Sequence, residues 1–385
     1  MIGVTGSTGQ LGSRIVARLA GVPLRLIVRD PARAPSVPGA SVAQAAYGEH
    51  SALLEALDGV DVLMLLSATE SADRVALHKA TVDAAVAAGV RRIVYTSFVG
   101  ASPGATFTFA RDHWHTEEHI RSSGVEFTFL RDNLYLDFVS GGVGEDGVIR
   151  GPAGDGRVAA VSRDDVAAVA ATILRTADSP PTTPTPAASS QPTPAASGPP
   201  GTSAVASGPS AAAPAASGAS STSTAPPSTA GASGAFGASG ASGASGASGA
   251  SGTSGTSAVA SGASAAAPST AGSAGLSAAG SAGSAPGAGD HVGATYDLTG
   301  PRAFTLSEAA AILSDVWGRK VRYEPETLDE AFRSRESYGA PAWEVAGWVT
   351  SYAAIASGEL SQVSTAVRDI TGVEPTGFEE YVRAQ

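Results

Sequence analysis

The sequence predicts an α/β fold with a doubly wound parallel sheet. Two observations lead to this fold class. Short apolar runs alternate along the chain with segments of helical spacing, as they do where helices connect parallel strands. The first run, residues 1–4, also leads directly into a glycine-rich turn and then into the amphipathic stretch 13–19. Strand, glycine turn and helix in this order are typical of a nucleotide-binding fold of the Rossmann type.

Later segments continue this alternation. Strands are expected at 24–28, 60–66, 92–97, 125–130 and 296–298, and helices at 51–57, 72–88, 116–122 and 162–176. A further helix is expected to begin at Thr305, because Thr305-Leu306-Ser307-Glu308 has the pattern of a capping box. In an open parallel sheet the ligand lies outside the carboxyl ends of the strands. Residues that follow the strands are therefore the first candidates for a site.

The turn after the first strand reads Thr5-Gly6-Ser7-Thr8-Gly9-Gln10-Leu11-Gly12. Gly6 permits a tight turn, Gly9 lets a pyrophosphate approach the backbone, and Gly12 lets the helix pack closely on the strand. The spacing is G-x-x-G-x-x-G rather than G-x-G-x-x-G, and glycines could serve a tight strand-to-helix turn alone. With the flanking strands and helix, the pattern predicts a dinucleotide site formed by Gly6, Thr8, Gly9, Gln10, Leu11 and Gly12.

Two arginines follow the second expected strand, where a protein that prefers NAD carries a carboxylate for the ribose 2′-hydroxyl. Arg29 and Arg33 favour a 2′-phosphate instead, because guanidinium groups form bidentate, charge-assisted bonds with phosphate. The sequence therefore predicts NADPH as the cofactor. The alternative is that both arginines are solvated loop charges and that Asp30 contacts the ribose.

Small polar residues end two further strands. Ser67 and Thr69 follow one strand, and Thr96 and Ser97 end the next. These residues are candidates for contacts with the ribose and nicotinamide, or they simply terminate strands as small polar residues often do. Asn133 and Tyr135, just past the strand at 125–130, are candidates for the substrate cleft.

A long low-complexity segment divides the chain. Between Asp178 and Asp290 there is no charged residue, and nearly every residue is Ala, Ser, Gly, Pro or Thr. Such a segment cannot bury enough apolar surface to offset its ordering entropy, so 179–289 is expected to be a disordered insert. We expect 1–178 to form the nucleotide-binding domain and 290–385 to complete the fold with a small C-terminal α/β lobe on the substrate side.

Composition narrows the classes of partner. The net charge of −11 argues against nucleic acid or an anionic membrane surface. The absence of cysteine excludes thiol catalysis, thiolate metal sites and disulfides, and it suits a reducing cytoplasm. A first strand at the very start leaves no room for a signal peptide, and the longest apolar run, 60–66, is too short to span a bilayer. We therefore expect a cytoplasmic protein that acts on a small molecule.

Several motifs of the chain form a recognisable set. They are the glycine loop 5–12, Val28-Arg29-Asp30-Pro31-Ala32-Arg33, Tyr95-Thr96-Ser97, Leu130-Arg131-Asp132-Asn133-Leu134-Tyr135 and 151–157, with 296–300 and 338–341 beyond the insert. Together they resemble the NmrA-like atypical short-chain dehydrogenases, and most closely their type 2 NAD(P)H:quinone oxidoreductases. The resemblance implies hydride transfer from NADPH to a quinone-like acceptor. It also leaves open a redox sensor that binds NADP(H) without turnover and acts through a protein partner, and a homodimer.

One departure from the wider superfamily concerns the proton donor. Ordinary short-chain dehydrogenases use a Tyr-x-x-x-Lys pair on the helix after the 92–97 strand. Here 109–119 contains neither residue, so the catalytic residues stay unassigned. A quinone needs such an acid less than a ketone does, because hydride addition yields a resonance-stabilised quinolate that water can protonate.

Two further groups of residues leave alternatives open. His113, His115 and His119 lack a nearby third ligand of known geometry, so no metal is expected. They form a solvated helix face, or one of them lies near the substrate. Tyr338, Trp343, Trp348 and Tyr352 either pack in the core, which their helical spacing favours, or stack on a flat substrate.

Overall fold

A seven-stranded parallel sheet forms the centre of the protein in the computed structural model, which describes residues 1–177 and 291–385. The strand order is β3-β2-β1-β4-β5-β6-β9. The strands are β1 (Ile2–Thr5), β2 (Leu24–Val28), β3 (Ala40–Gln44), β4 (Val62–Leu65), β5 (Arg92–Phe98), β6 (Glu126–Asp132) and β9 (Thr295–Leu298). The predicted disordered insert, 179–289, lies outside the described residues.

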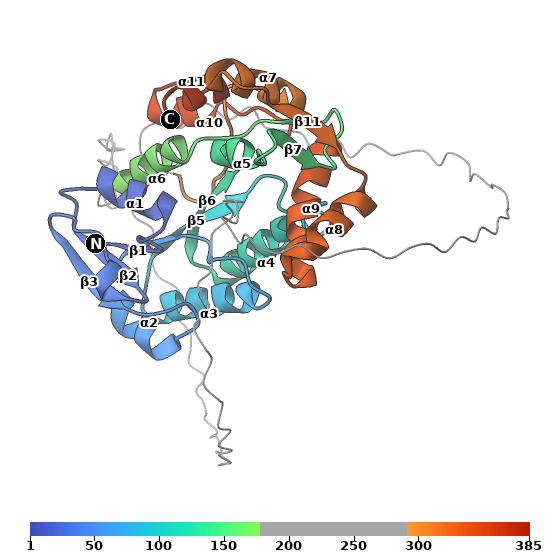
Figure 1. Cartoon of the computed structure of the whole chain (residues 1–385). Coiled ribbons are helices and arrows are strands. Elements are labelled where there is room, and N and C mark those ends of the chain that lie inside the picture. The colour runs from blue at the N-terminus through green and yellow to red at the C-terminus, as the bar shows by residue number, and fades with distance from the viewer. Residues whose placement is uncertain (178–290) are drawn as a thin grey trace, which may run out of the picture. The chain divides into compact units, whose positions relative to one another are not determined.

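Helices cover both faces of the sheet (Figure 1). One face packs against α1 (Gln10–Arg18) and α6 (Arg163–Ala177), and the other against α2 (His50–Leu57), α3 (Arg74–Ala87) and α4 (Thr108–Ser123). Burial on both faces explains why the central strands read as continuous apolar runs. The predicted doubly wound α/β fold is confirmed. The strand order reverses between β1 and β4, and in such sheets ligands bind at this switch point.

The edge strand β3 was not expected from the sequence. Its residues, Ala-Ser-Val-Ala-Gln, are exposed or only half-buried, so they carry no continuous apolar signal. The strand is held by its parallel pairing with β2, from Leu24 opposite Ala40 to Val28 opposite Gln44. Pairing with β2 therefore stabilises a strand that the apolar periodicity of the sequence did not indicate.

Both sides of the insert contribute to the same sheet. Strand β9, which follows the insert, pairs in parallel with β6, with Leu130 opposite Tyr296 and Asp132 opposite Leu298. The Thr128 hydroxyl also donates a hydrogen bond to the His291 carbonyl oxygen at 2.7 Å. The chain after the insert therefore completes the fold that the first part begins.

A smaller lobe is built from segments on both sides of the insert (Figure 1). Strand β7 (Val148–Gly151) pairs with β11 (Arg322–Pro325), and β8 (Arg157–Val158) pairs with β10 (Phe304–Thr305). Its apolar core also draws on helices around these strands. The remaining helices are α5 (Leu136–Gly141), α7 (Leu306–Trp317), α8 (Leu328–Arg335), α9 (Ala342–Ala356), α10 (Ala366–Thr371) and α11 (Phe378–Arg383). Two 3-10 turns are η1 (Pro31–Arg33), between β2 and β3, and η2 (Glu336–Tyr338), after α8.

Local signals placed most helix starts well. The capping box that opens α7 is present: Thr305 Oγ1 accepts the Glu308 N–H at 3.0 Å, and the Glu308 carboxylate accepts the Thr305 N–H at 2.9 Å. Helix α4 is the exception, because it begins at Thr108 rather than near residue 116. Its Thr108 N–H donates to Thr350 Oγ1 on α9 at 3.1 Å, a cap that is invisible in the local sequence.

No helix in the described part of the chain, 1–177 and 291–385, is long and apolar enough to cross a membrane.

Candidate functional site

The glycine loop forms a very tight connection between β1 and α1. Gly6 has φ +63°, in the left-handed region that favours glycine, and its carbonyl oxygen accepts the Gly9 N–H at 3.0 Å. A Cβ at Gly12 would lie 2.1 Å from the Gly6 carbonyl oxygen. Only a residue without a side chain can therefore stand at position 12 while α1 keeps this distance from the strand.

The first turn of α1 has the properties of an anion site. Gly9 is its N-cap and supplies no side-chain cap, and no acidic residue lies in the first turn. The first N–H groups of a helix have no intrahelical acceptor, and the helix dipole makes this end favourable for negative charge. Ser7 beside it is fully buried, and its hydroxyl has no hydrogen-bond partner among the described residues. These groups fit a phosphate.

The two predicted phosphate-binding arginines lie at the surface after β2. Arg29 and Arg33 are exposed, and neither forms an ion pair with a described residue. The Arg29 carbonyl oxygen accepts the Gln44 side-chain N–H at 3.1 Å, which holds the main chain in place. One carboxylate oxygen of Asp30 accepts the Ala32 N–H at 3.0 Å and caps η1. One oxygen of the Asp30 carboxylate, the alternative contact for the ribose, is therefore already engaged by the main chain.

The small polar residues at the ends of β4 and β5 divide into two groups. Thr96 Oγ1 accepts the Ser67 N–H at 2.8 Å, so Thr96 lies directly behind the loop that carries Ser67 and the exposed Thr69. Ser97 is fully buried, and its hydroxyl donates to Glu117 of α4 at 2.6 Å. Because successive side chains of a strand point to opposite faces, the structure does not bring Ser97 together with Ser67 and Thr69.

Asn133 and Tyr135 lie past the end of β6, as predicted, but both side chains already have protein partners. Asn133 is buried, its amide N–H donates to the Leu360 carbonyl oxygen at 3.0 Å, and its Oδ1 accepts the Leu134 N–H at 2.8 Å. The Tyr135 hydroxyl donates to Asp132, and the Arg163 guanidinium lies 3.9 Å from the centre of the Tyr135 ring. Both residues stabilise the backbone around the expected cleft, and their contact with a substrate stays a prediction.

The three histidines of α4 have separate surroundings. His113 is buried, and its Nδ1 lies 2.9 Å from the Tyr95 hydroxyl. Burial, with the nearby Arg74 guanidinium, holds the pKa of His113 well below its usual range. His115 is exposed beside Trp114, and His119 pairs with Asp83 at 2.7 Å. No group of three or more potential metal-ligating side chains occurs within 1–177 and 291–385.

The C-terminal aromatic residues are mainly packing residues. Tyr352 is buried with its ring 5.4 Å from Phe138, and Trp343 is half-buried with its ring 6.0 Å from Phe109 of α4. Tyr338, in contrast, is 69% exposed and makes an edge contact with Trp348 at 6.1 Å. The core interpretation therefore holds for Tyr352 and largely for Trp343, while Tyr338 lies at the surface.

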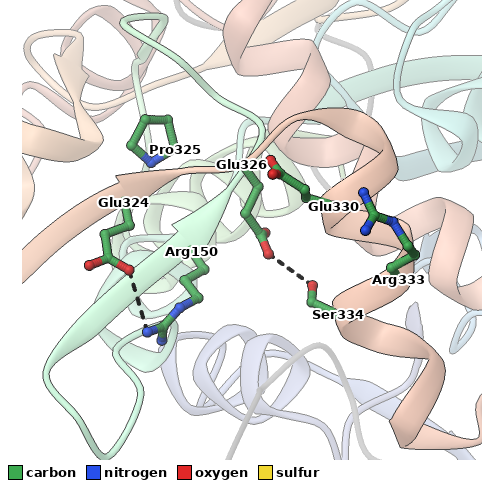
Figure 2. A pocket seen from close by; sticks show the side chains of 7 residues that line it. All are labelled: Arg150, Glu324, Pro325, Glu326, Glu330, Arg333 and Ser334. Atoms are coloured by element: carbon green, nitrogen blue, oxygen red, sulfur yellow. Dashed lines mark hydrogen bonds and ion pairs between the residues drawn. The ribbon is translucent and has the colours of Figure 1, made fainter. Parts of the chain in front are cut away.

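An open cleft of about 490 Å³ lies between β7, β11 and α8. Figure 2 shows the side chains that line it. Its charged side chains are mostly paired within the protein: Arg150 with Asp146 at 2.6 Å and with Glu324 at 3.4 Å. Glu326 pairs with Arg335 at 3.0 Å. None of the predicted site residues lines this cleft, whose lining is Arg150, Glu324, Pro325, Glu326, Glu330, Arg333 and Ser334.

Some residues at the strand ends were not singled out from the sequence. The Tyr47 hydroxyl lies 2.6 Å from Thr5 Oγ1 and 2.5 Å from the Leu66 carbonyl oxygen, and His78 Nε2 accepts the Ala68 N–H at 2.8 Å. The only local signal that could have pointed to His78 is its place as a single histidine on the buried face of a helix. Tyr47 lies after the edge strand that periodicity did not indicate.

Asp132 is expected to make stability depend on pH. Burial raises its pKa to about 7, although the Tyr135 hydroxyl and the Arg163 guanidinium lower it. A carboxyl whose pKa is raised in the folded state contributes stability below its unfolded pKa and loses it as pH rises through the folded pKa. Relative to the wild type, the unfolding free energy of Asp132→Asn is therefore expected to rise by on the order of 3 kcal/mol as the pH increases from about 4 to 8.

Urea denaturation of both proteins across this range measures the difference. Asp315→Asn is the control, because the Asp315 side chain is 75% exposed and pairs with Arg383 at the surface. A gap between Asp132→Asn and the wild type that stays constant with pH would contradict the expectation.

Comparison with known proteins agrees with this geometry. Residues 6–177 match the NAD(P)H-binding family. The chain is 39% identical over 183 residues to quinone oxidoreductase 2 of Escherichia coli strain K12, a match that covers 45% of this chain and 64% of that protein. The chain therefore spans about 64% of the length of this curated relative.

Solved structures share this fold. The NADPH-dependent quinone oxidoreductase of Escherichia coli, complexed with NADPH, has a TM-score of 0.65 and 25% identity, covering 100% of this chain and 99% of that one. NmrA, a negative transcriptional regulator in complex with NAD, has a TM-score of 0.57 and 14% identity over 99% and 94% of the two chains, a likeness of fold alone. The match of residues 6–177 to the NAD(P)H-binding family agrees with the fold shared with these structures.

Proposed function

We propose that this protein binds NADPH along the carboxyl ends of β2, β1, β4 and β5 and reduces a quinone-like acceptor. One observation carries the cofactor assignment: the uncapped first turn of α1 behind a glycine loop whose Gly12 has no space for a side chain. Oriented N–H groups and the helix dipole at this point favour a pyrophosphate. The similarity to the quinone oxidoreductase of Escherichia coli, which was solved with NADPH, supports the same assignment.

Three groups of residues at the strand ends would contact three different parts of the cofactor. The glycine loop would hold the pyrophosphate, Arg29 and Arg33 the 2′-phosphate, and the ends of β4 and β5 the nicotinamide half. The residues proposed for the loop are Gly6, Thr8, Gly9, Gln10, Leu11 and Gly12, and those for the nicotinamide half are Ser67, Thr69, Thr96 and Ser97. Of the latter, Ser97 fits least well, because its hydroxyl is engaged by Glu117.

Bound NADPH would supply a hydride to the acceptor. The protein's part would be to hold the acceptor over the nicotinamide, since proximity and orientation can provide much of the rate. We propose that no side chain of α4 acts as a proton donor in the place of a Tyr-Lys pair. His113 is buried, and its Nδ1 is hydrogen-bonded to the Tyr95 hydroxyl, so this ring is already engaged within the protein.

The first prediction concerns cofactor choice. We expect Arg29→Asp to weaken NADPH binding about tenfold or more, because a hydrogen bond to a charged group contributes roughly 1.5 to 3 kcal/mol. NADH has no 2′-phosphate, so its affinity should change less. Fluorescence titration of both nucleotides measures the two affinities, with Arg333→Asp, an exposed arginine of α8, as the matched control. An unchanged ratio of NADPH to NADH affinity would refute the role of Arg29.

The second prediction tests the activity itself. Purified protein mixed with NADPH and a panel of quinones is expected to consume NADPH steadily, as followed by absorbance of the reduced nicotinamide. Omitting the quinone is the control for slow oxidation by oxygen. Tight NADPH binding with no turnover of any quinone would contradict the proposal and favour a sensor that acts through a protein partner.

The third prediction concerns reaction direction. Oxidation of a secondary alcohol needs a base for the hydroxyl proton, which contributes typically 10² to 10⁴ in rate. We expect the protein to reduce quinones but not to oxidise simple secondary alcohols with NADP between pH 6 and 10. Assays of both reactions on the same preparation provide the comparison. Rapid alcohol oxidation that is lost in His113→Asn or His115→Asn would show that α4 does supply a base.

A further inference from the structure

We infer that His78 is a positioning residue that fixes loop 66–69 for the nicotinamide half of the cofactor. This inference rests on the proposed function, because that function places the nicotinamide beside the loop. It concerns a residue that would touch neither cofactor nor substrate and that acts through the main chain of Ala68.

The observation that carries the inference is a run of three consecutive main-chain N–H groups after β4. Each donates to a different buried side chain. The Leu66 N–H donates to Thr5 Oγ1 at 3.1 Å, the Ser67 N–H to Thr96 Oγ1 at 2.8 Å, and the Ala68 N–H to His78 Nε2 at 2.8 Å. The acceptors come from β1, β5 and α3, so three elements hold the loop at once.

These bonds replace the sheet pairing that ends at Leu65. Main-chain N–H groups in the interior need an acceptor, and an unpaired one costs roughly as much as a lost hydrogen bond. The Leu66 carbonyl oxygen is also engaged, because the Tyr47 hydroxyl lies 2.5 Å from it. The protein thus fixes the backbone from inside and leaves Ser67 half-buried and Thr69 exposed at the strand ends.

The hydrogen bonds also determine the form of the His78 ring. Since Nε2 accepts the Ala68 N–H, the proton of the neutral ring lies on Nδ1, which donates to Thr116 Oγ1 at 2.9 Å. The Thr116 hydroxyl donates in turn to the Asp112 carbonyl oxygen at 2.9 Å. Burial, with the Arg74 guanidinium, lowers the pKa of His78 to about 3, so the ring stays an acceptor for Ala68 at neutral pH.

Aromatic neighbours hold the ring between two strand ends. The His78 ring lies 6.1 Å from that of Tyr47 and 5.8 Å from that of Tyr95, in an edge contact with the latter. The ring is fully buried. A side chain that is packed on both sides and bonded through both nitrogens has one arrangement, so it holds the Ala68 N–H in one place.

The test compares His78→Leu with His78→Gln. Leucine keeps the apolar volume but removes the acceptor, whereas glutamine offers a carbonyl oxygen to the Ala68 N–H. Binding is measured by calorimetry for NADPH and for adenosine 2′,5′-bisphosphate, which carries the 2′-phosphate half but no nicotinamide. We expect His78→Leu to weaken the binding of NADPH about tenfold, the equivalent of about 1.4 kcal/mol. Its affinity for the bisphosphate should stay unchanged. His78→Gln should recover most of the NADPH affinity.

Controls separate positioning from loss of the fold. His119→Leu changes a half-buried histidine of α4 that pairs with Asp83 and should bind both compounds like the wild type. Where His78→Leu does not fold, Thr116→Val removes the acceptor that holds Nδ1 of His78 and is expected to give the same selective loss. The inference would be overturned if His78→Leu bound NADPH and the bisphosphate equally more weakly, or if its affinity for NADPH did not fall.

The outcomes distinguish this inference from the function on which it rests. A wild-type protein that binds neither NADPH nor the bisphosphate refutes both. A wild type that binds NADPH, with His78→Leu binding it equally well, refutes the positioning role and leaves the proposed cofactor site intact.

Discussion

The close packing of α1 on the end of β1 is the constraint on which the rest of the site depends. Position 12 has room for no Cβ, because the Gly6 carbonyl oxygen would lie 2.1 Å away. This approach brings the uncapped first turn of α1 to the strand ends and places the helix where α6 can pack beside it, with Asp164 bonded to Arg14 and Arg18. A side chain at position 12 would have to move the helix, and with it the N–H groups that suit a phosphate.

Buried polar groups behind the strand ends are paired with one another. Glu117 is fully buried, and its two oxygens accept bonds from Arg131 at 2.8 and 2.6 Å and from Ser97 at 2.6 Å. A buried carboxylate is costly unless such partners are present, so this network constrains where β5, β6 and α4 meet. Ser97 and Thr96 are adjacent, yet one serves this network and the other serves loop 66–69. Strand alternation assigns them these different positions.

Residues 291–385 pack around the candidate site and do not form a separate domain. The Glu359 carboxylate accepts the Thr106 N–H at 3.1 Å, and the Leu360 carbonyl oxygen accepts the Asn133 side chain at 3.0 Å. Adjacent residues of the C-terminal part thus hold the loops after both β5 and β6. Gly347 of α9 has the same effect on α4, since a Cβ there would lie 2.3 Å from the Phe109 ring. These contacts fix the loops that follow β5 and β6 and the position of α4.

Local sequence determined most of the elements and the tight glycine loop, because apolar periodicity, glycine turns and capping residues act between neighbours in the chain. The fold class, most of the strands and helices, and the capping box of α7 follow from such signals. Tertiary structure alone decided which side chains meet. Thr350 caps α4 from 242 residues away, and Thr96 reaches the Ser67 N–H from 29 residues away. Partners so distant in sequence leave no local pattern, since their bonds form only when the packing of strands and helices brings them together.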